Sequence, residues 1–501
     1  LIFGPSKRRA QAMSLNLITD RWILVKCVGG QTRLIAPWQM GDPDLLAPNW
    51  PRPDLNIGCL ELMIGLVFIA DPPTSPKDWR ERTVADPDRL QEKLLKFEPA
   101  FRLLGAGPLF MQDLELLDGP PNKPDMLFID SAGANTAKNN ADLMVHRERY
   151  DVLDPGLAAI ALHTFQNFAP SGGAGNRTSM RGGGPLVTLV DPGGSLWDLI
   201  WANVPYGAEA DLNELPWMRP TRVSDKGQET LPPDGKSYNA ETFFGMPRRL
   251  RLVSDERGII GVIQKPSGNN YAKWIHPLSP YYRLKEGAVW LPKHPPADRF
   301  SYNNWLGVVA QSKKEGNTKL ALTLWNWHQR GSGDTQVIVA GWSMDNMKPR
   351  DFTLSVPPLL DLPIEQEDIL IGLIQAASAA YSALKHALGA VIANGTAPEA
   401  QRDTFFSVTE VQLLAHIQTL RTGGDPRSQW LQDLKKQGLN QFDALAMPGL
   451  DQRETDEIQK IVQARCQLTA AYAGYGKLGQ ELFHQLSMEL PVPKPKKRGK
   501  T

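Results

Sequence analysis

Proline divides this 501-residue chain into two parts of different character. Residues 1–363 hold 35 of the 41 prolines, whereas residues 364–490 hold three. Because proline lacks a backbone N–H and clashes within a helix, runs of long helices are disfavoured in the first part and permitted in the second. Tryptophan is distributed in the same way, since 13 of the 14 precede residue 350. The sequence therefore predicts a turn-rich N-terminal region followed by a helical region.

Apolar residues recur at every third or fourth position in four successive segments of residues 364–490. This spacing places them on one face of an amphipathic helix. Short connections that contain glycine or proline, such as Gly423-Gly424, separate the segments. The pattern predicts an antiparallel four-helix bundle. Its helices are expected within residues 370–391, 405–420, 428–447 and 451–490.

The region before the bundle mixes both periodicities and predicts an α+β domain over residues 14–363. A hairpin is expected near its end, from the β-rich stretches 337–342 and 351–356, with residues 343–350 as a long polar tip. Residues 1–13 are expected to be disordered or foreign to the fold, and residues 491–501 form a basic tail. The remaining clear patterns are strands at 18–25 and 186–190 and helices at 60–70 and 156–168.

The formal net charge of +1 conceals an uneven distribution of charge. Residues 1–12 carry +3 and residues 491–501 carry +5, which leaves about −7 for the residues between them. Within that acidic body, residues 236–285, here called the basic segment, hold nine basic and three acidic side chains. Its net charge of +6 predicts a local surface for nucleic acid, with an ordinary solvated face as the alternative. A hydrophobic content of 42% excludes a disordered chain.

Three cysteines, Cys27, Cys59 and Cys466, lie far apart in apolar surroundings. Their odd number and spacing predict buried free thiols, which is typical of a cytoplasmic protein. The longest apolar run, residues 62–70, is too short to span a bilayer and predicts a buried core helix. No membrane partner is therefore expected.

The common catalytic and cofactor motifs are missing from the sequence. There is no G-x-x-x-x-G-K-[ST] phosphate loop, no H-E-x-x-H zinc motif and no G-x-S-x-G nucleophile elbow. The eight histidines are scattered and form no close cluster with aspartate. The residues supply no catalytic constellation, and neither a metal nor a cofactor is expected.

Residues 169–185, here called the glycine loop, hold six glycines and two arginines between a predicted helix and a predicted strand. Glycine has no Cβ, so such a backbone can approach a ligand closely. Arg177 and Arg181 add charge that suits phosphate. A flexible linker and an anion or nucleic-acid contact remain alternatives. The dinucleotide spacing G-x-G-x-x-G is not met.

Several motifs in this order resemble CasA, the large subunit of the type I-E CRISPR complex Cascade. The glycine loop carries Ala-Pro, a glycine-rich stretch and two arginines before Gly-Gly. The resemblance covers about residues 14–490 and includes the helical C-terminus. Its other pieces are the segments 16–22, 56–62, 243–249 and 274–280.

The resemblance implies a subunit that is not an enzyme and that reads a protospacer-adjacent motif in double-stranded DNA. It implies that the glycine loop enters the minor groove, where a close-fitting backbone reads groove width and few base edges. It also implies partners: the 5′ handle of the guide RNA, other Cascade subunits and a recruited helicase-nuclease. The residues that correspond to the groove contact are Gly172, Gly173, Ala174 and Gly175.

Three further elements follow from the same resemblance. A hairpin wedge that starts strand separation corresponds to residues 344–347, with Asp345, Asn346 and Met347 at the DNA. A lysine contact to the motif corresponds to Lys265, with Lys273 as the alternative. A mobile loop that helps hold the subunit in the complex corresponds to residues 131–140; its residues are Asn135, Lys138, Asn139 and Asn140. Some members carry cysteines after the Pro-Arg-Arg segment, but residues 254–257 contain none, so no zinc is expected.

Two interpretations from other functional classes remain open on the sequence. The glycine loop fits an anion nest in an enzyme that binds a nucleotide or a phosphorylated metabolite. The helical region alone fits a scaffold that docks neighbouring subunits without contacting DNA.

Overall fold

The structure, a computed structural model, groups the chain into two units. Unit 1 comprises Leu1–Ala297 and Gly316–Leu359, and unit 2 comprises Asp298–Glu315 and Leu360–Thr501. Residues 298–315 therefore group with the helical unit, although the predicted boundary at residue 363 assigns them to the first domain. The structure describes residues 15–131, 138–139, 147, 149–173, 175–297, 299–311, 316–331, 333–392 and 398–492.

The core of unit 1 is built around the apolar helix α2 (Pro53–Ala70). All its residues except Pro53 and Asn56 are buried, as expected for a helix that is apolar on every side. By length and composition α2 could cross a membrane, but 89% of it is buried inside the protein. The prediction of a buried core helix at 60–70 is confirmed. The other α-helices among the described residues of unit 1 are α3 (Pro76–Glu81), α4 (Pro87–Leu95), α6 (Pro155–Phe168), α7 (Leu196–Ala202), α8 (Ala240–Phe243) and α9 (Leu322–Gln329).

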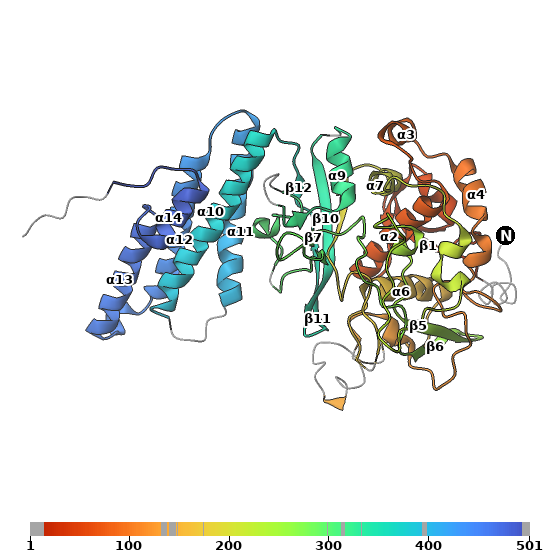
Figure 1. The fold of residues 1–501 in the computed structure, drawn as a ribbon. Coiled ribbons are helices and arrows are strands. Elements are labelled where there is room, and N and C mark those ends of the chain that lie inside the picture. Colours follow the sequence, from red (N-terminus) through yellow and green to blue (C-terminus); the bar gives the residue numbers. More distant parts are fainter. Residues whose placement is uncertain are drawn as a thin grey trace, which may run out of the picture. The chain divides into compact units, whose positions relative to one another are not determined.

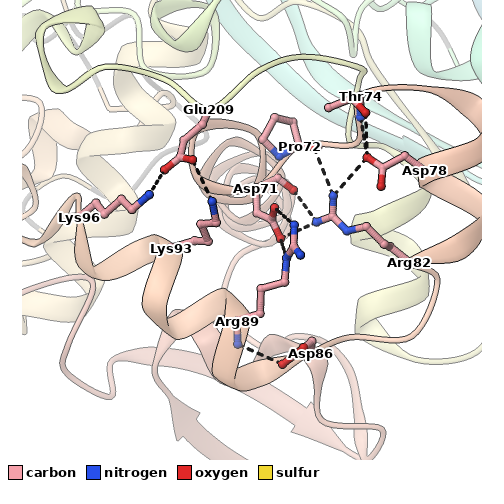
Figure 2. Close-up of polar contacts among 10 residues, drawn as sticks. All are labelled: Asp71, Pro72, Thr74, Asp78, Arg82, Asp86, Arg89, Lys93, Lys96 and Glu209. Atoms are coloured by element: carbon pink, nitrogen blue, oxygen red, sulfur yellow. Dashed lines mark hydrogen bonds and ion pairs between the residues drawn. The ribbon is translucent and has the colours of Figure 1, made fainter.

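An ion-pair cluster fastens α3 and α4 to the C-terminal end of α2 (Figure 2). The carboxylate of Asp71, the residue that ends α2, accepts from Arg89 Nε and Nη2, both at 2.8 Å, and also from Arg82. Lys93 of α4 reaches the carboxylate of Glu209 with an N···O distance of 2.9 Å. Asp71 is the buried residue of this cluster, so leaving its carboxylate unpaired would cost the most free energy. The cluster thus fixes the direction of the core helix.

The described strands of unit 1 form four small sheets. The first strand begins at Ile23 because residues 17–20 form a turn, so the predicted strand at 18–25 starts too early. The predicted strand at 186–190 is confirmed as β4 (Val187–Asp191). The remaining strands, sheet by sheet, are β1 (Ile23–Cys27), β2 (Thr32–Ile35) and β3 (Leu45–Pro48); β5 (Arg249–Asp255) and β6 (Gly258–Lys265); β7 (Tyr281–Tyr282), β8 (Leu291–Pro292) and β9 (Thr318–Lys319); and β10 (Thr335–Asp345), β11 (Lys348–Ser355) and β12 (Pro358–Leu359) with β4.

The predicted hairpin is confirmed as β10 and β11, which Figure 1 shows as a long paired ribbon. Its tip, however, is only two residues long, so the prediction of a long tip over 343–350 is wrong. Asn346 and Met347 have φ of +48° and +64°, which is the backbone of a tight two-residue hairpin turn. Pairing continues to the residues that flank the turn, Asp345 and Lys348, because a bulge absorbs the register shift nearby.

Unit 2 contains five helices among its described residues rather than four. The first three follow the predicted segments, and Trp430 anchors the third by donating its indole N–H to Leu373 O at 2.9 Å. The first helix contacts each of the others, so it is the centre of the bundle. The helices are α10 (Ile364–Gly389), α11 (Pro398–Arg421), α12 (Arg427–Ala446), α13 (Thr455–Ala471) and α14 (Gly476–Gln485).

The predicted fourth helix is broken between α13 and α14. Gly474 and Gly476 have φ of +87° and +73°, which terminates a right-handed helix. A Cβ on Gly479 would lie 2.5 Å from Ala471 O, so only glycine allows α14 to pack this closely against the end of α13. The apolar period continues through the break, which is why it does not reveal the break. Cys466 on α13 is exposed, contrary to the expectation of a buried thiol.

Candidate nucleic-acid interface

The part of the glycine loop that reaches the surface comprises residues 170–173 and 175–177, here called the glycine turn, which are exposed or half-buried. Gly172 N–H donates to Asn176 O at 3.3 Å, and Asn176 N–H donates to Gly173 O at 2.8 Å. The described glycines of the turn, including Gly175, are exposed. Gly173 and Gly175 have φ of +66° and +80°, a backbone that glycine adopts without steric cost. The turn therefore presents its backbone to solvent with little side-chain cover.

The second run of glycines packs against the β10–β11 hairpin. Gly184 is buried with a φ of +63°, and a Cβ there would lie 2.7 Å from Trp342 Cβ and 2.8 Å from Met344 Cε. A Cβ on Gly183 would lie 3.3 Å from Met347 Sδ. These contacts bring the tip of the hairpin beside the glycine loop, although more than 150 residues separate them in sequence. The resemblance to CasA assigned both elements to DNA, and the structure places them side by side.

The two arginines of the glycine loop make internal contacts. Arg177 is half-buried, and its Nε donates to Ser224 Oγ at 2.8 Å. Arg181 is 1% exposed, and its guanidinium donates to both carboxylate oxygens of Glu61 on α2, at 2.7 and 3.1 Å, and to Ser279 Oγ at 3.2 Å. The prediction that Arg181 contacts DNA is therefore wrong, because burial and a bidentate partner remove its charge from the surface.

Two buried histidines lie near the Arg181–Glu61 pair. Burial, together with the positive charge of Arg181, lowers the pKa of His163 to about 3. Burial and Arg181 also lower the pKa of His276 well below its usual value. Both rings are therefore neutral at pH 7, and Glu61 and Arg181 carry the charge of this buried cluster. Its place under the glycine loop makes it a structural support for the loop.

The two predicted lysines are on the surface. Lys265 at the end of β6 pairs with Asp118, with an N···O distance of 2.9 Å, and this contact lowers the pKa of the aspartate. Lys273 is exposed and has a φ of +66°. Lys138 and Asn139 of the predicted mobile loop are exposed as well. Three further predicted site residues lie outside the part of the chain that the structure describes: Asn135, Asn140 and Ala174.

The basic segment presents less charge than its count suggests. Acidic residues from another part of the chain pair with it: Asp113 and Glu115 with Arg249, at 2.6 and 2.8 Å, and Asp118 with Lys265. Arg248 is buried. Counting charge within a sequence window misses these partners. The lysines of the segment that remain exposed are Lys236, Lys273 and Lys285.

Two groups of residues beside the glycine loop were missed by reasoning from the sequence. Arg248 lies under the glycine turn and contacts its backbone. Lys348 and Arg350 on β11 are exposed and follow directly after the hairpin tip. Both groups could be seen in the sequence. Arg248 belongs to the Pro-Arg-Arg segment that the resemblance includes, and Lys348 and Arg350 flank a proline directly after the predicted hairpin tip.

A family model described as CRISPR-associated protein Cse1 matches residues 16–441. The chain belongs to the Cse1 family. This membership confirms the resemblance to CasA, the large subunit of Cascade. Cse1 is a structural subunit of that complex, so other Cascade subunits are plausible neighbours of this chain.

Solved Cse1 structures share this fold at low sequence identity. Thermus thermophilus CasA (Cse1) is 19% identical with a TM-score of 0.70, and the match covers 91% of this chain and 99% of that one. Thermobifida fusca Cse1 is 17% identical with a TM-score of 0.69, covering 94% and 99%. Cse1 from Acidimicrobium ferrooxidans is 15% identical with a TM-score of 0.66, covering 95% and 99%. The likeness therefore extends over both units.

The anion-nest alternative loses the side-chain charge that would assist it. Arg177 is bonded to Ser224 and Arg181 to Glu61, so neither guanidinium is directed toward an anion at the turn. Among the residues that the structure describes, no three His, Cys, Asp or Glu side chains gather where they could hold a metal ion.

Proposed function

We propose that this Cse1 chain recognises a protospacer-adjacent motif in duplex DNA and starts the separation of its strands. The observation that supports this most directly is the contact between the glycine loop and the hairpin tip at Gly183 and Met347. An exposed backbone turn and an exposed apolar tip thus share one surface. A duplex that meets the turn also meets the tip.

The glycine turn suits the minor groove for a steric reason. The minor groove of B-DNA is about 6 Å wide, so a side chain hinders the approach of a protein backbone. Gly173 presents its backbone without a Cβ in front of it, and a Cβ there would meet nothing within 4 Å. A backbone contact of this kind reads groove width and a few base edges, so several motifs are accepted.

The hairpin tip suits strand opening. Met347 is 47% exposed, although apolar side chains of this size are usually buried. Its unbranched side chain is flexible and can insert between base pairs, where apolar wedges unstack a duplex. Asn346 beside it adds an amide that can bond to a base edge. The tight turn holds both residues at the end of two paired strands, which resist bending.

Phosphate contacts position the duplex without reading its sequence. Lys265, Lys273 and the β11 cations Lys348 and Arg350 are available for this around the glycine loop. Reading of the target sequence is delegated to base pairing with the guide RNA, whose 5′ handle and neighbouring subunits are the other proposed partners. The exposed Lys138 takes part in holding the subunit in place. The last proposed partner is a helicase-nuclease, which the complex recruits in an antiviral defence in the cytoplasm.

Gly173→Arg is expected to weaken binding of a motif-containing duplex by about 100-fold, or about 2.7 kcal/mol. The new side chain fits the free protein, because the space around Gly173 is open, but it blocks the groove contact. A gel-shift titration of the assembled complex measures the affinity. The matched control is Gly29→Arg, which adds the same charge at a remote glycine of similar φ, +84°, in open space. Equal affinities of the two variants would contradict the groove contact.

The double variant Asn346→Ala with Met347→Ala is expected to slow strand opening about tenfold and to change initial affinity less than threefold. The tip acts after the duplex has docked, so its loss affects the second step. Fluorescence of 2-aminopurine beside the motif reports opening. Leu354→Ala, which removes an exposed apolar side chain from the same hairpin, serves as the control. Unchanged opening rates in the tip variant would refute the wedge.

A further inference from the structure

A single buried arginine spans the base of the glycine turn. Arg248 precedes β5, and its Nε donates to Arg177 O at 2.7 Å. Its Nη2 donates to Pro170 O at 2.5 Å. These two carbonyls stand at the two ends of the glycine turn, so one planar guanidinium holds both arms of the turn. Arg248 is 5% exposed.

The arginine is itself held firmly against α6. Its backbone N–H donates to Gln166 Oε1 at 3.1 Å, and Gln166 Nε2 donates back to Arg248 O at 3.0 Å. The guanidinium carbon lies 5.4 Å from the ring centroid of Phe165, one residue before Gln166. Arg248 therefore connects the turn to a buried helix, in addition to the contacts that Arg177 and Gly175 make with Ser224 and Ser267.

The charge of Arg248 is unusual for its surroundings. Among the described residues no carboxylate pairs with it, and its guanidinium donates to two backbone carbonyls. Burial alone lowers the pKa of Arg248 to about 10, which leaves it charged at pH 7. A buried cation without an acid costs stability, and a neutral side chain of similar size would avoid that cost. The two hydrogen bonds to carbonyls and the contact with the Phe165 ring offset part of this free-energy cost.

We propose that Arg248 is a positioning residue for the glycine turn, and the proposal rests on the proposed function of that turn in DNA recognition. Its guanidinium sets the separation of the two arms and brings a positive charge beneath the exposed glycines. A duplex then meets a preformed turn and loses no affinity to ordering it.

The same geometry explains the glycine at the first position of the turn. A Cβ on Gly172 would lie 3.0 Å from Arg248 Nη1 and 3.1 Å from Nη2. A larger residue there requires the guanidinium to shift by a few tenths of an ångström relative to the carbonyls that it bridges. Gly172 and Arg248 are therefore a coupled pair, although Gly172 has an ordinary φ and needs no special backbone conformation.

Arg248→Lys tests the proposal, because lysine keeps the charge but lacks the planar fork that bridges two carbonyls. Hydrogen exchange of the Asn176 amide, in the assembled complex without DNA, is expected to be about tenfold faster. The ratio of affinities for duplexes with and without the motif is expected to fall about tenfold. Binding to the duplex without the motif stays within about twofold, since the charge is retained. Arg251→Lys is the matched control, because Arg251 donates to one backbone carbonyl, Asp113 O, and does not contact the turn.

The two readouts separate this inference from the function on which it rests. If the wild-type complex shows no preference for a motif, the proposed function fails, and exchange of Asn176 still decides whether Arg248 orders the turn. If the wild type has a preference and Arg248→Lys retains it in full, the positioning role is overturned. A fall in affinity for both duplexes by the same factor would also overturn it, since that indicates a general loss of structure.

Gly172→Ala disturbs the contact between Gly172 and Arg248 by a change in the exposed turn, and it leaves the buried charge in place. It covers the case in which Arg248→Lys fails to fold. Its methyl group is expected to displace the guanidinium, with faster exchange at Asn176 and a smaller motif preference, as for Arg248→Lys. Ser171→Ala, at the exposed neighbour, is the control. Wild-type exchange and wild-type preference in Gly172→Ala would contradict the coupling.

Discussion

Glu61→Gln is expected to lower the free energy of unfolding of unit 1 by about 3–5 kcal/mol. The substitution keeps the shape of the side chain and removes the charge that faces Arg181. Arg181 is 1% exposed and is bonded bidentately to Glu61, so it would remain as a buried cation without its anion. The neighbouring His163 and His276 cannot compensate, because both are neutral bases. Native proteins are stable by only about 5–15 kcal/mol, so this loss is a large fraction of the total.

Urea denaturation followed by tryptophan fluorescence measures the loss, since 12 of the 14 tryptophans lie in unit 1. The control is the double variant Glu61→Leu with Arg181→Met, which removes both charges together. It is expected to be less destabilised than Glu61→Gln, because paired buried charges are often replaceable by apolar side chains of similar volume. A double variant that is at least as unstable as the single one would show that the charge pair is not the origin of the effect.

Gly184→Ala is expected to destabilise unit 1 by about 2–5 kcal/mol and to move the hairpin away from the glycine loop. Two costs add: a left-handed backbone costs a non-glycine residue about 1–2 kcal/mol, and overpacking costs about 1–3 kcal/mol. The methyl group would press on the carbonyl and Cβ of Trp342 and on Met344 Cε. These atoms belong to the strand that carries the wedge, so strand opening is expected to suffer together with stability.

Gly29→Ala separates the two costs. Gly29 has a φ of +84°, but a Cβ there would meet nothing within 4 Å. Only the backbone term of about 1–2 kcal/mol is expected. Thermal melting of the three proteins gives the comparison, and 2-aminopurine fluorescence of the assembled complexes gives the opening rate. If Gly184→Ala costs no more than Gly29→Ala, the packing of loop against hairpin is looser than described.

Elements with a strong local signal were predicted well. The apolar run that became α2, the strand β4 and the hairpin β10–β11 are where the sequence puts them, because each depends on local periodicity. The break before α14 was missed, since apolar periodicity continues through Gly474 and Gly476. The short hairpin tip was also missed. Pairing of Asp345 with Lys348 depends on a bulge, which is decided by cross-strand contacts and not by composition.

The amino-acid sequence alone was enough to locate the boundary between turn-rich and helical regions, the family motifs and the positions of the glycines. It also located the positive charges, but not which of them remain on the surface. Folding decides this, because each charged side chain pairs with whichever group lies within a few ångströms of it in the structure. Arg181 has its partner, Glu61, 120 positions away, and Arg248 reaches carbonyls more than 70 positions away. Burial and long-range pairing therefore turn two arginines from surface contacts into supports of the glycine loop.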